Sequence, residues 1–185
     1  MSIFQSSEPK VKVRLTYDDL VQFPEDGRRH EIIDGVHYMS PSPVPYHQVL
    51  SRELLIQLCE AFREIGLGQV FHAPIDVQFS EHDVVEPDLI VVLNDNPIVT
   101  ESRIVGVPDL LIEILSPSTS DRDRNLKKRL YESYGAPEYW IVDPDRKVVQ
   151  QYVFEGAAYA EPVSCPEQIT YRGVDNVVVD LLKIW

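Results

Sequence analysis

The sequence contains little cysteine, since Cys59 and Cys165 are the only two among 185 residues. They form no Cys-x-x-Cys unit, which argues against a structural zinc site and against a disulfide framework. A chain of this kind fits the reducing cytoplasm, where we expect the protein to reside. No apolar run approaches the roughly 18 residues needed to span a bilayer, so we expect no membrane partner. Residues 1–12 lack the apolar segment of a secretory signal, and we expect a loose terminus there.

Positive charge is also scarce. The chain has 17 Lys and Arg residues against 30 Asp and Glu residues, which gives a formal net charge of −13. This balance argues against a broad electrostatic grip on nucleic acid, whose phosphates require cations. It leaves room for a local basic patch or for a metal ion inside an acidic cleft. Residues 122–129 form the one concentration of basic residues, and they either contact a phosphate backbone or form a solvated helix face.

The length suits one domain over residues 1–185, and the sequence shows no repeat and no linker. A Thr16–Asp19 capping box predicts a short helix over residues 17–23, and Asp34-Gly35 predicts a hairpin turn. The apolar patterns predict further helices over residues 46–65 and 121–134. The expected strands cover residues 30–33, 36–39, 69–79, 84–93, 107–115, 138–142, 147–154 and 157–163. We therefore expect a mixed α/β (α+β) fold with a central β-sheet flanked by helices, on which the apolar residues 177–185 dock.

One charged residue interrupts the most apolar of these strands. Residues 108–116 read Pro-Asp-Leu-Leu-Ile-Glu-Ile-Leu-Ser, in which Glu113 is surrounded by residues typical of a strand buried on both faces. Removing an unpaired carboxylate from water costs several kcal/mol, roughly, even after relaxation. Such a residue therefore indicates a partner, a metal ion or a chemical role.

Asp88 is the first expected partner of Glu113. It precedes the apolar run of residues 89–93, so the two carboxylates can lie side by side on neighbouring strands. Two such charges repel each other, and a divalent cation between them removes the conflict. Mg²⁺ commonly takes one or two carboxylates together with waters and substrate phosphates. In the alternative interpretation, Asp88 is a solvated residue at the end of a strand.

Lys127 is the second expected partner. At about 100° per residue, Asp123, Lys127, Leu130 and Tyr134 share one helical face, which indicates that Lys127 points inward. A lysine there offsets buried carboxylates, orients or helps to deprotonate a water, or stabilises charge developing on a phosphate. A surface ion pair between Asp123 and Lys127 explains the same spacing equally well. With Asp88 and Glu113, the first interpretation suits metal-assisted hydrolysis of a phosphodiester.

His47 lies on the apolar face of the helix expected over residues 46–65. A histidine at such a position is more often a residue of the core than a catalyst, so a role in the site is the second interpretation.

Several motifs in order resemble the PD-(D/E)XK nuclease superfamily. Within it, residues 16–155 resemble a large restriction-endonuclease-like family that was long classed as a domain of unknown function. The resemblance rests on the following segments: Glu86-Pro87-Asp88, residues 108–120, Asp123 to Lys127, residues 31–35, residues 40–43 with His47, and residues 135–144.

The resemblance implies a restriction-endonuclease-like fold in which Asp88 and Glu113 bind Mg²⁺. The usual lysine of the superfamily stands two residues after the second acid, where this chain has Leu115. The family moves the lysine to the following helix, where Lys127 matches. Glu31 is then either a third carboxylate of the site or a solvent-facing residue of the hairpin, and the resemblance favours the site.

We therefore expect an endonuclease that hydrolyses DNA phosphodiester bonds with Mg²⁺, or with Mn²⁺ as an alternative ion. Asp88, Glu113 and Lys127 form the expected catalytic set, and Glu31 and His47 are additional candidates. A homodimer is plausible, because cutting both strands needs two sites. The alternative is a non-catalytic binding or assembly module that retains the fold, which the net charge of −13 and Leu115 favour. Hydrolysis of a smaller phosphoester is a third interpretation.

Overall fold

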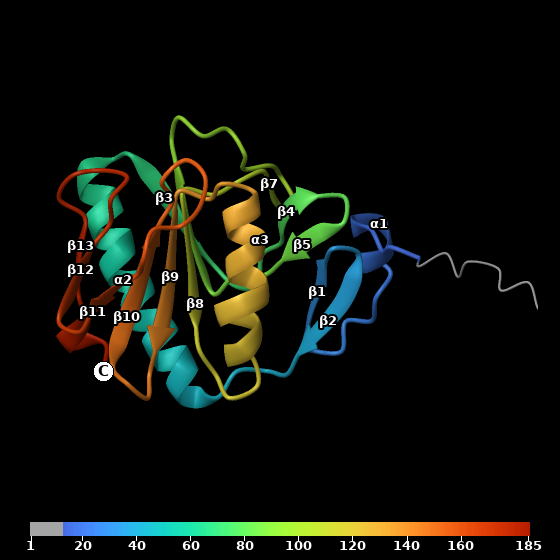
Figure 1. Cartoon of the computed structure of the whole chain (residues 1–185), viewed down its shortest axis with the longest axis horizontal. Coiled ribbons are helices and arrows are strands. Elements are labelled where there is room, and N and C mark those ends of the chain that lie inside the picture. The colour runs from blue at the N-terminus through green and yellow to red at the C-terminus, as the bar shows by residue number, and fades with distance from the viewer. Residues whose placement is uncertain (1–12) are drawn as a thin grey trace, which may run out of the picture.

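The computed structural model describes residues 13–185, and the loose terminus expected at residues 1–12 lies outside this part (Figure 1). Within the described residues the largest sheet has six strands in the order β11-β10-β9-β8-β6-β3. These strands are β3 (Gly68–His72), β6 (Leu89–Leu93), β8 (Leu110–Ile114), β9 (Glu138–Asp143), β10 (Val148–Val153) and β11 (Val163–Cys165). Strand β8 is parallel to β9 and antiparallel to β6, so the central sheet is mixed. This confirms the expected fold class.

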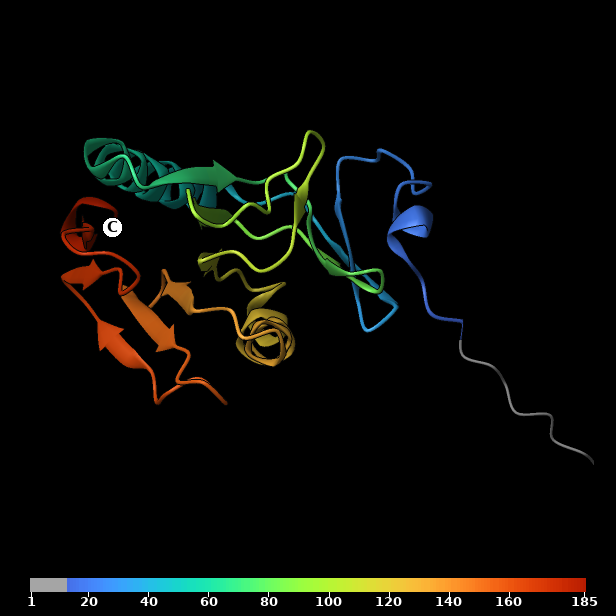
Figure 2. The same ribbon diagram turned by 90° about the horizontal axis from the view of Figure 1, so that it is seen from above.

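Helices cover opposite faces of this sheet, as Figures 1 and 2 show. Helix α2 (Pro45–Ile65) lies on one face, where Leu50, Leu54 and Leu58 are fully buried. On the other face a π-helix, η1 (Arg122–Lys127), continues directly into α3 (Lys128–Ser133). The sequence predicts one continuous helix there, and the π-helical start differs because an apolar spacing near 3.6 residues does not reveal an i→i+5 hydrogen-bond pattern.

A second sheet of five strands lies on the same side as α3 (Figure 2). Its order is β2-β1-β5-β4-β7, with strands β1 (Arg29–Ile33), β2 (Val36–Ser40), β4 (Val77–Ser80), β5 (Asp83–Val85) and β7 (Ile104–Val105). The predicted turn between β1 and β2 is confirmed, since Asp34 and Gly35 have φ angles of 52° and 71°. Such values are required by the tight turns that match the twist of a hairpin.

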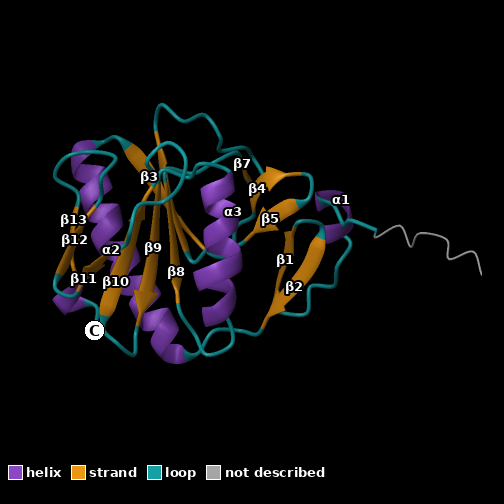
Figure 3. Cartoon of the chain, in the orientation of Figure 1, coloured by secondary structure: helices purple, strands orange, loops and turns teal. Residues whose placement is uncertain are grey.

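The predicted capping box is also confirmed, because Asp19 Oδ2 accepts hydrogen bonds from the backbone N and Oγ1 of Thr16. Helix α1 (Tyr17–Leu20) is shorter than the expected residues 17–23, and a turn follows it. Figure 3 shows the two larger helical segments, at α2 and α3, among the strands of the sheets.

Two predicted strands are each divided by a proline. Residues 69–79 split at Pro74 into β3 and β4, and residues 84–93 split at Pro87 into β5 and β6. The continuous strands predicted there are wrong. Proline lacks the N–H that continues a ladder, and at both points the chain passes between the two sheets.

The strand predicted over residues 157–163 is also wrong. After the turn at Gly156, this segment makes an isolated bridge between Tyr159 and Phe154, and β11 begins only at Val163. Pro162 removes a donor between these two pairings, which explains the interruption.

The C-terminal residues dock on the α2 face, as the sequence predicts. Strands β12 (Gln168–Thr170) and β13 (Val178–Asp180) form a two-stranded sheet, followed by the 3₁₀-helix η2 (Leu181–Lys183). Val177, Val179 and Leu181 are buried in the same core cluster as α2. Among the described residues, no helix combines the length and the apolar character that crossing a membrane requires.

Candidate active site

Asp88 and Glu113 lie opposite each other on neighbouring strands. Strands β6 and β8 pair Leu89 with Ile112, and one further step along this register places Asp88 beside Glu113. The backbone N–H of Ile114 donates to Asp88 Oδ2 over 2.8 Å. Asp88 is 3% exposed and Glu113 is 2% exposed. The structure therefore brings together two carboxylates that are almost completely shielded from water.

The helix on this face supplies two partners to Glu113. Lys127 Nζ lies 2.8 Å from Glu113 Oε1, and the hydroxyl of Tyr131 donates to the same oxygen over 2.8 Å. Lys127 and Tyr131 stand four residues apart, so both project from one side of the η1–α3 segment. Lys127 is 2% exposed, which agrees with its predicted inward direction and contradicts a surface pair with Asp123.

Glu31 joins the same group of residues from β1. Its Oε1 lies 2.7 Å from Lys127 Nζ and also accepts the backbone N–H of Glu86 over 3.0 Å. Arg122 lies 3.6 Å from Glu31 Oε2 and donates a hydrogen bond to Ser40. Glu31 is 1% exposed, so the interpretation as a solvent-facing hairpin residue is wrong.

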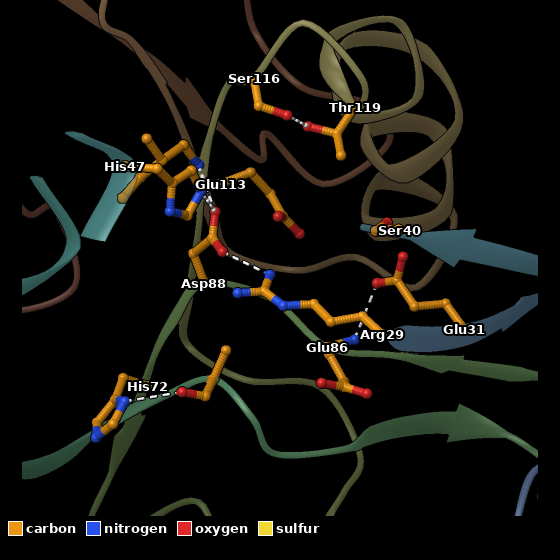
Figure 4. A network of polar contacts seen from close by, with 12 residues as sticks. Arg29, Glu31, Ser40, His47, His72, Glu86, Asp88, Glu113, Ser116 and Thr119 are labelled. Carbon is orange, nitrogen blue, oxygen red and sulfur yellow. Dashed lines mark hydrogen bonds and ion pairs between the residues drawn. The ribbon is translucent and has the colours of Figure 1, made fainter. Parts of the chain in front are cut away.

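Asp88 is held by two basic side chains, as Figure 4 shows. Arg29 Nη1 lies 2.6 Å from Asp88 Oδ1, and His47 Nε2 lies 3.0 Å from Asp88 Oδ2. His47 comes from the first turn of α2 and is buried. Its Nδ1 has no hydrogen-bond partner among the described residues. His47 thus contacts the site, although it also belongs to the buried face of its helix.

These contacts set the protonation of the two acids in opposite directions. Burial opposes the charge on Asp88, but the hydrogen bond and charge of His47 and the charge of Arg29 lower its pKa to about 2. Burial raises the pKa of Glu113 to about 8; Lys127 lowers it, while the carboxylates of Asp123 and Asp88 raise it further. Glu113 is therefore the acid whose charge is less well compensated.

Lys127 remains an ammonium ion. Burial by itself opposes its charge, but the carboxylates of Glu113, Glu31 and Asp123 outweigh burial and raise the pKa of Lys127 above its ordinary value. A lysine with a raised pKa does not accept a proton near neutral pH. The geometry therefore supports a role as a fixed positive charge and not as a base.

With the exception of Tyr131, which lies behind Glu113, the side chains of this network line one cavity with a volume of about 230 Å³. Among the described residues, four carboxylates and three permanent cations face it: Glu31, Asp88, Glu113 and Asp123, with Arg29, Arg122 and Lys127. Asp123 is 2% exposed, and its Oδ1 has no partner in this part of the chain. In this part of the chain the lining holds more acidic groups than permanent cations, and one buried oxygen lacks a partner. A cation bound there would favour the charged form of Glu113, whose pKa burial raises.

Comparison with known proteins fits this arrangement. Residues 17–175 match the sequence model of the Uma2 family, described as "Putative restriction endonuclease". The chain belongs to the Uma2 family. The resemblance seen in its motifs is thereby confirmed.

A solved structure shares the fold. It is described as "a putative nuclease belonging to DUF820" from Anabaena variabilis, and it matches with a TM-score of 0.73 at 21% sequence identity. The match covers 92% of this chain and 97% of the other. No curated protein matches this chain.

The site of this Uma2 protein fits Mg²⁺ in its donor chemistry. Both Glu113 contacts fall on Oε1, so its other oxygen remains for a ligand beside Asp88. In residues 13–185 no group of three His, Cys, Asp or Glu side chains is arranged to hold a metal ion. Two carboxylates are nevertheless enough for Mg²⁺, which completes its shell with waters and phosphate oxygens.

Leu115 occupies the position of the superfamily's usual lysine. It is 8% exposed and packs in the core on the α3 side of the sheet. The ammonium group that reaches Glu113 comes instead from Lys127 on the following helix, as the resemblance implies.

Sequence reasoning missed Arg29, Arg122 and Tyr131 as members of the site. Arg29 could have been found from strand alternation, because Arg29 and Glu31 lie two residues apart and share one face of β1. Tyr131 could have been found from its spacing of four residues from Lys127. Nothing local signals that Arg29 reaches Asp88, 59 residues away.

The basic residues 122–129 form neither a free phosphate-binding surface nor a fully solvated face. Arg122 and Lys127 bind Glu31, and Arg124 lies 2.6 Å from Asp143. Arg129 is the exposed member of this set. Most of this positive charge is thus used to compensate acids within the protein.

Proposed function

We propose that this Uma2 protein is a Mg²⁺-dependent endonuclease that hydrolyses DNA phosphodiester bonds, with Mn²⁺ as an alternative ion. The observation that supports this most strongly is the pair of adjacent buried carboxylates, Asp88 and Glu113, lining a cavity beside the ammonium group of Lys127. Family membership supports the same reaction. Asp88 and Glu113 would hold the ion, and it would supply Lewis acidity and a more acidic bound water.

Lys127 supplies a fixed positive charge next to the reacting phosphate. Tyr131 and Glu31 fix its position, because Tyr131 anchors Glu113 and Glu31 binds the ammonium from the other side. A preorganised cation in a dry site stabilises negative charge as it develops on the phosphoryl oxygens. Lys127 is thus a catalytic residue that carries charge, and no proton transfer is assigned to it.

Arg29 and Arg122 receive the substrate phosphate at the rim of the cavity. The side chains are 22% and 13% exposed, respectively, so both are partly accessible. Because the net charge of the protein is negative, these two arginines are needed to create a positive potential at the cavity, which attracts the phosphate. His47 holds Asp88 in place and acts as a positioning residue. A homodimer would supply the second site that double-strand cleavage needs.

The test is cleavage of plasmid and single-stranded DNA with Mg²⁺ or Mn²⁺. We expect Glu113→Gln and Lys127→Gln each to lower the rate by at least about 100-fold, the scale of losing one preorganised electrostatic contact. Glu138→Gln is a matched control, since Glu138 is a buried carboxylate on the next strand that binds Trp140 and Gln151 outside the cavity. Circular dichroism verifies that each variant is folded. Cleavage that survives both site substitutions contradicts the site assignment.

A second candidate function is a non-catalytic binding or assembly module with the nuclease fold. The observation that favours it is the complete pairing of Asp88, whose two oxygens are taken by Arg29, His47 and the N–H of Ile114. Because these contacts already compensate the charge of Asp88, binding a metal ion there would gain less free energy. Absence of both cleavage and Mg²⁺ binding by calorimetry would support this function over the first.

A further inference from the structure

A second and larger cavity adjoins the candidate active site. Its volume is about 460 Å³, within the range typical of small-molecule pockets. Four residues line both cavities: Val44, His47, Ser116 and Pro117. The two spaces therefore meet at His47, which contacts the site carboxylate Asp88 from the first cavity. Because the two cavities share these walls, one ligand is able to occupy both.

Tyr46 provides an aromatic wall for this second cavity. It lies in the first turn of α2 and is 45% exposed, which makes it the one exposed Phe, Tyr or Trp side chain in residues 13–185. Val44, Leu115, Pro117 and Pro144 add apolar walls, and the rest of the lining is polar or charged, including Asp143 and Asp145. An exposed ring beside apolar walls offers a platform for a flat partner, and nucleobases stack on such rings whatever their sequence.

Two arginines stand at the same cavity. Arg124 is fixed by Asp143 at 2.6 Å and by Gln150 at 2.5 Å, so its charge is compensated. Arg146 differs, because its side chain is 73% exposed and its contact with Asp143 is 3.9 Å long. An exposed, weakly paired guanidinium is well suited to a phosphate, to which arginine binds through paired hydrogen bonds.

We propose that this second cavity binds one unpaired nucleotide of the DNA substrate, next to the phosphate that is cut. Its base stacks on Tyr46, and Arg146 contacts its phosphate. The inference rests on the proposed nuclease function and adds a substrate class to it. A base held in a pocket has left the duplex stack, so the preferred substrate is single-stranded DNA or DNA with an unpaired or extruded nucleotide.

The test measures binding without cleavage. Fluorescence anisotropy follows a labelled single-stranded oligonucleotide, and the matching duplex, with Ca²⁺ in place of Mg²⁺ and in parallel with EDTA. One position carries 2-aminopurine, whose emission reports stacking of that base. The proteins are the wild type, Tyr46→Ala, Tyr46→Phe, Arg146→Gln and the control Ile56→Ala. Ile56 lies on the same helix and is 44% exposed, but it does not line the cavity.

We expect tighter binding of the single strand than of the duplex. Tyr46→Ala should weaken single-strand binding about 10-fold, which lies within the measured range for one base–aromatic stack. The 2-aminopurine emission should also differ between Tyr46→Ala and the wild type, because the stack on the ring is lost. Tyr46→Phe should retain binding, because it keeps the ring, Arg146→Gln should weaken it less than Tyr46→Ala, and Ile56→Ala should have no effect.

The outcomes separate this inference from the nuclease assignment. Binding that depends on Tyr46, with no cleavage in Mg²⁺ or Mn²⁺, supports the nucleotide pocket and contradicts the nuclease. Cleavage with unchanged single-strand binding in Tyr46→Ala contradicts the pocket alone. Equal losses in Tyr46→Ala and Ile56→Ala, or equal affinity for duplex and single strand, also overturn the pocket.

Discussion

On the α2 face of the central sheet, β8 contributes Ile112 and Ile114 to a cluster of buried apolar side chains. On the α3 face the same strand contributes Leu111 to an apolar cluster and Glu113 to the ion-pair network. On both faces β8 is shielded from bulk solvent, since all five of its residues are buried. The difference lies in what each face needs for stability.

The α2 face is stabilised mainly by burial of apolar area, which has no directional requirement, and its buried Glu138 accepts hydrogen bonds from Trp140 and Gln151. The α3 face contains buried charges that are tolerable because partners in ion pairs and hydrogen bonds compensate them. Those partners come from distant parts of the chain: Arg29 and Glu31 from β1, His47 from α2, and Lys127 from η1. In this sheet, one face packs an apolar core that stabilises the fold, and the other face carries the charged site.

The largest expected effect is on the α3 face. Lys127→Ala leaves Glu31 and Glu113 without their shared cation, and we expect a loss of about 3–5 kcal/mol in the free energy of unfolding. Combined with Glu113→Gln, the loss should be smaller than the sum of the two single losses, because one uncompensated charge is gone. Urea denaturation of the single and double variants measures this. Strictly additive losses would show that the two side chains are not coupled.

On the α2 face, Leu54→Ala should cost about 2–5 kcal/mol through lost burial and a residual cavity. Leu54 is fully buried in the apolar cluster of this face and lines neither of the two cavities. We expect the cleavage rate of the folded protein to stay near that of the wild type. A large loss of activity at a temperature where Leu54→Ala is folded would show that packing on the α2 face and activity on the α3 face are not independent.

Tyr131→Phe removes one of the two donors to Glu113 and keeps the apolar ring. We expect a loss of about 1–2 kcal/mol in stability, the scale of one buried hydrogen bond. Tyr139→Phe is a comparison on the same face, because its hydroxyl donates to the backbone carbonyl of Asp123 and not to a carboxylate of the site. Only Tyr131→Phe should also lower cleavage. Equal effects of both variants on cleavage would mean that Tyr131 acts through packing.

Mg²⁺ should stabilise the protein by a small amount. At ten times its dissociation constant, an ion that binds only the folded state adds about 1.4 kcal/mol to the free energy of unfolding. Asp88→Asn should abolish this increment, and Glu138→Gln should retain it. Thermal unfolding of each variant with and without Mg²⁺ measures this increment in stability. An increment that persists in Asp88→Asn would place the ion elsewhere.

Much of the site could be predicted from residue patterns. Glu113 in an apolar run and Asp88 at the start of another follow from local patterns. Helical spacing allowed Lys127 either to point inward or to form a surface pair, and the structure brings all three residues to one cavity. The direction of Lys127 survives the π-helical start of its helix, because a single such turn rotates the face only modestly. Pro74 and Pro87 could have predicted the breaks in these two strands. Proline lacks a backbone N–H, so it interrupts the hydrogen bonds of a strand that has neighbours on both sides.

The sequence by itself determined the mixed sheet, the helices and the identity of the acidic pair, because strand and helix periodicities are local properties. Only the tertiary structure decided that Glu31 belongs to the site, that Arg29 and His47 hold Asp88, and that one lysine serves two acids. These contacts join segments far apart in the chain. Their energies come from desolvation and charge pairing, and both depend on which side chains converge in space and not on their order in the sequence.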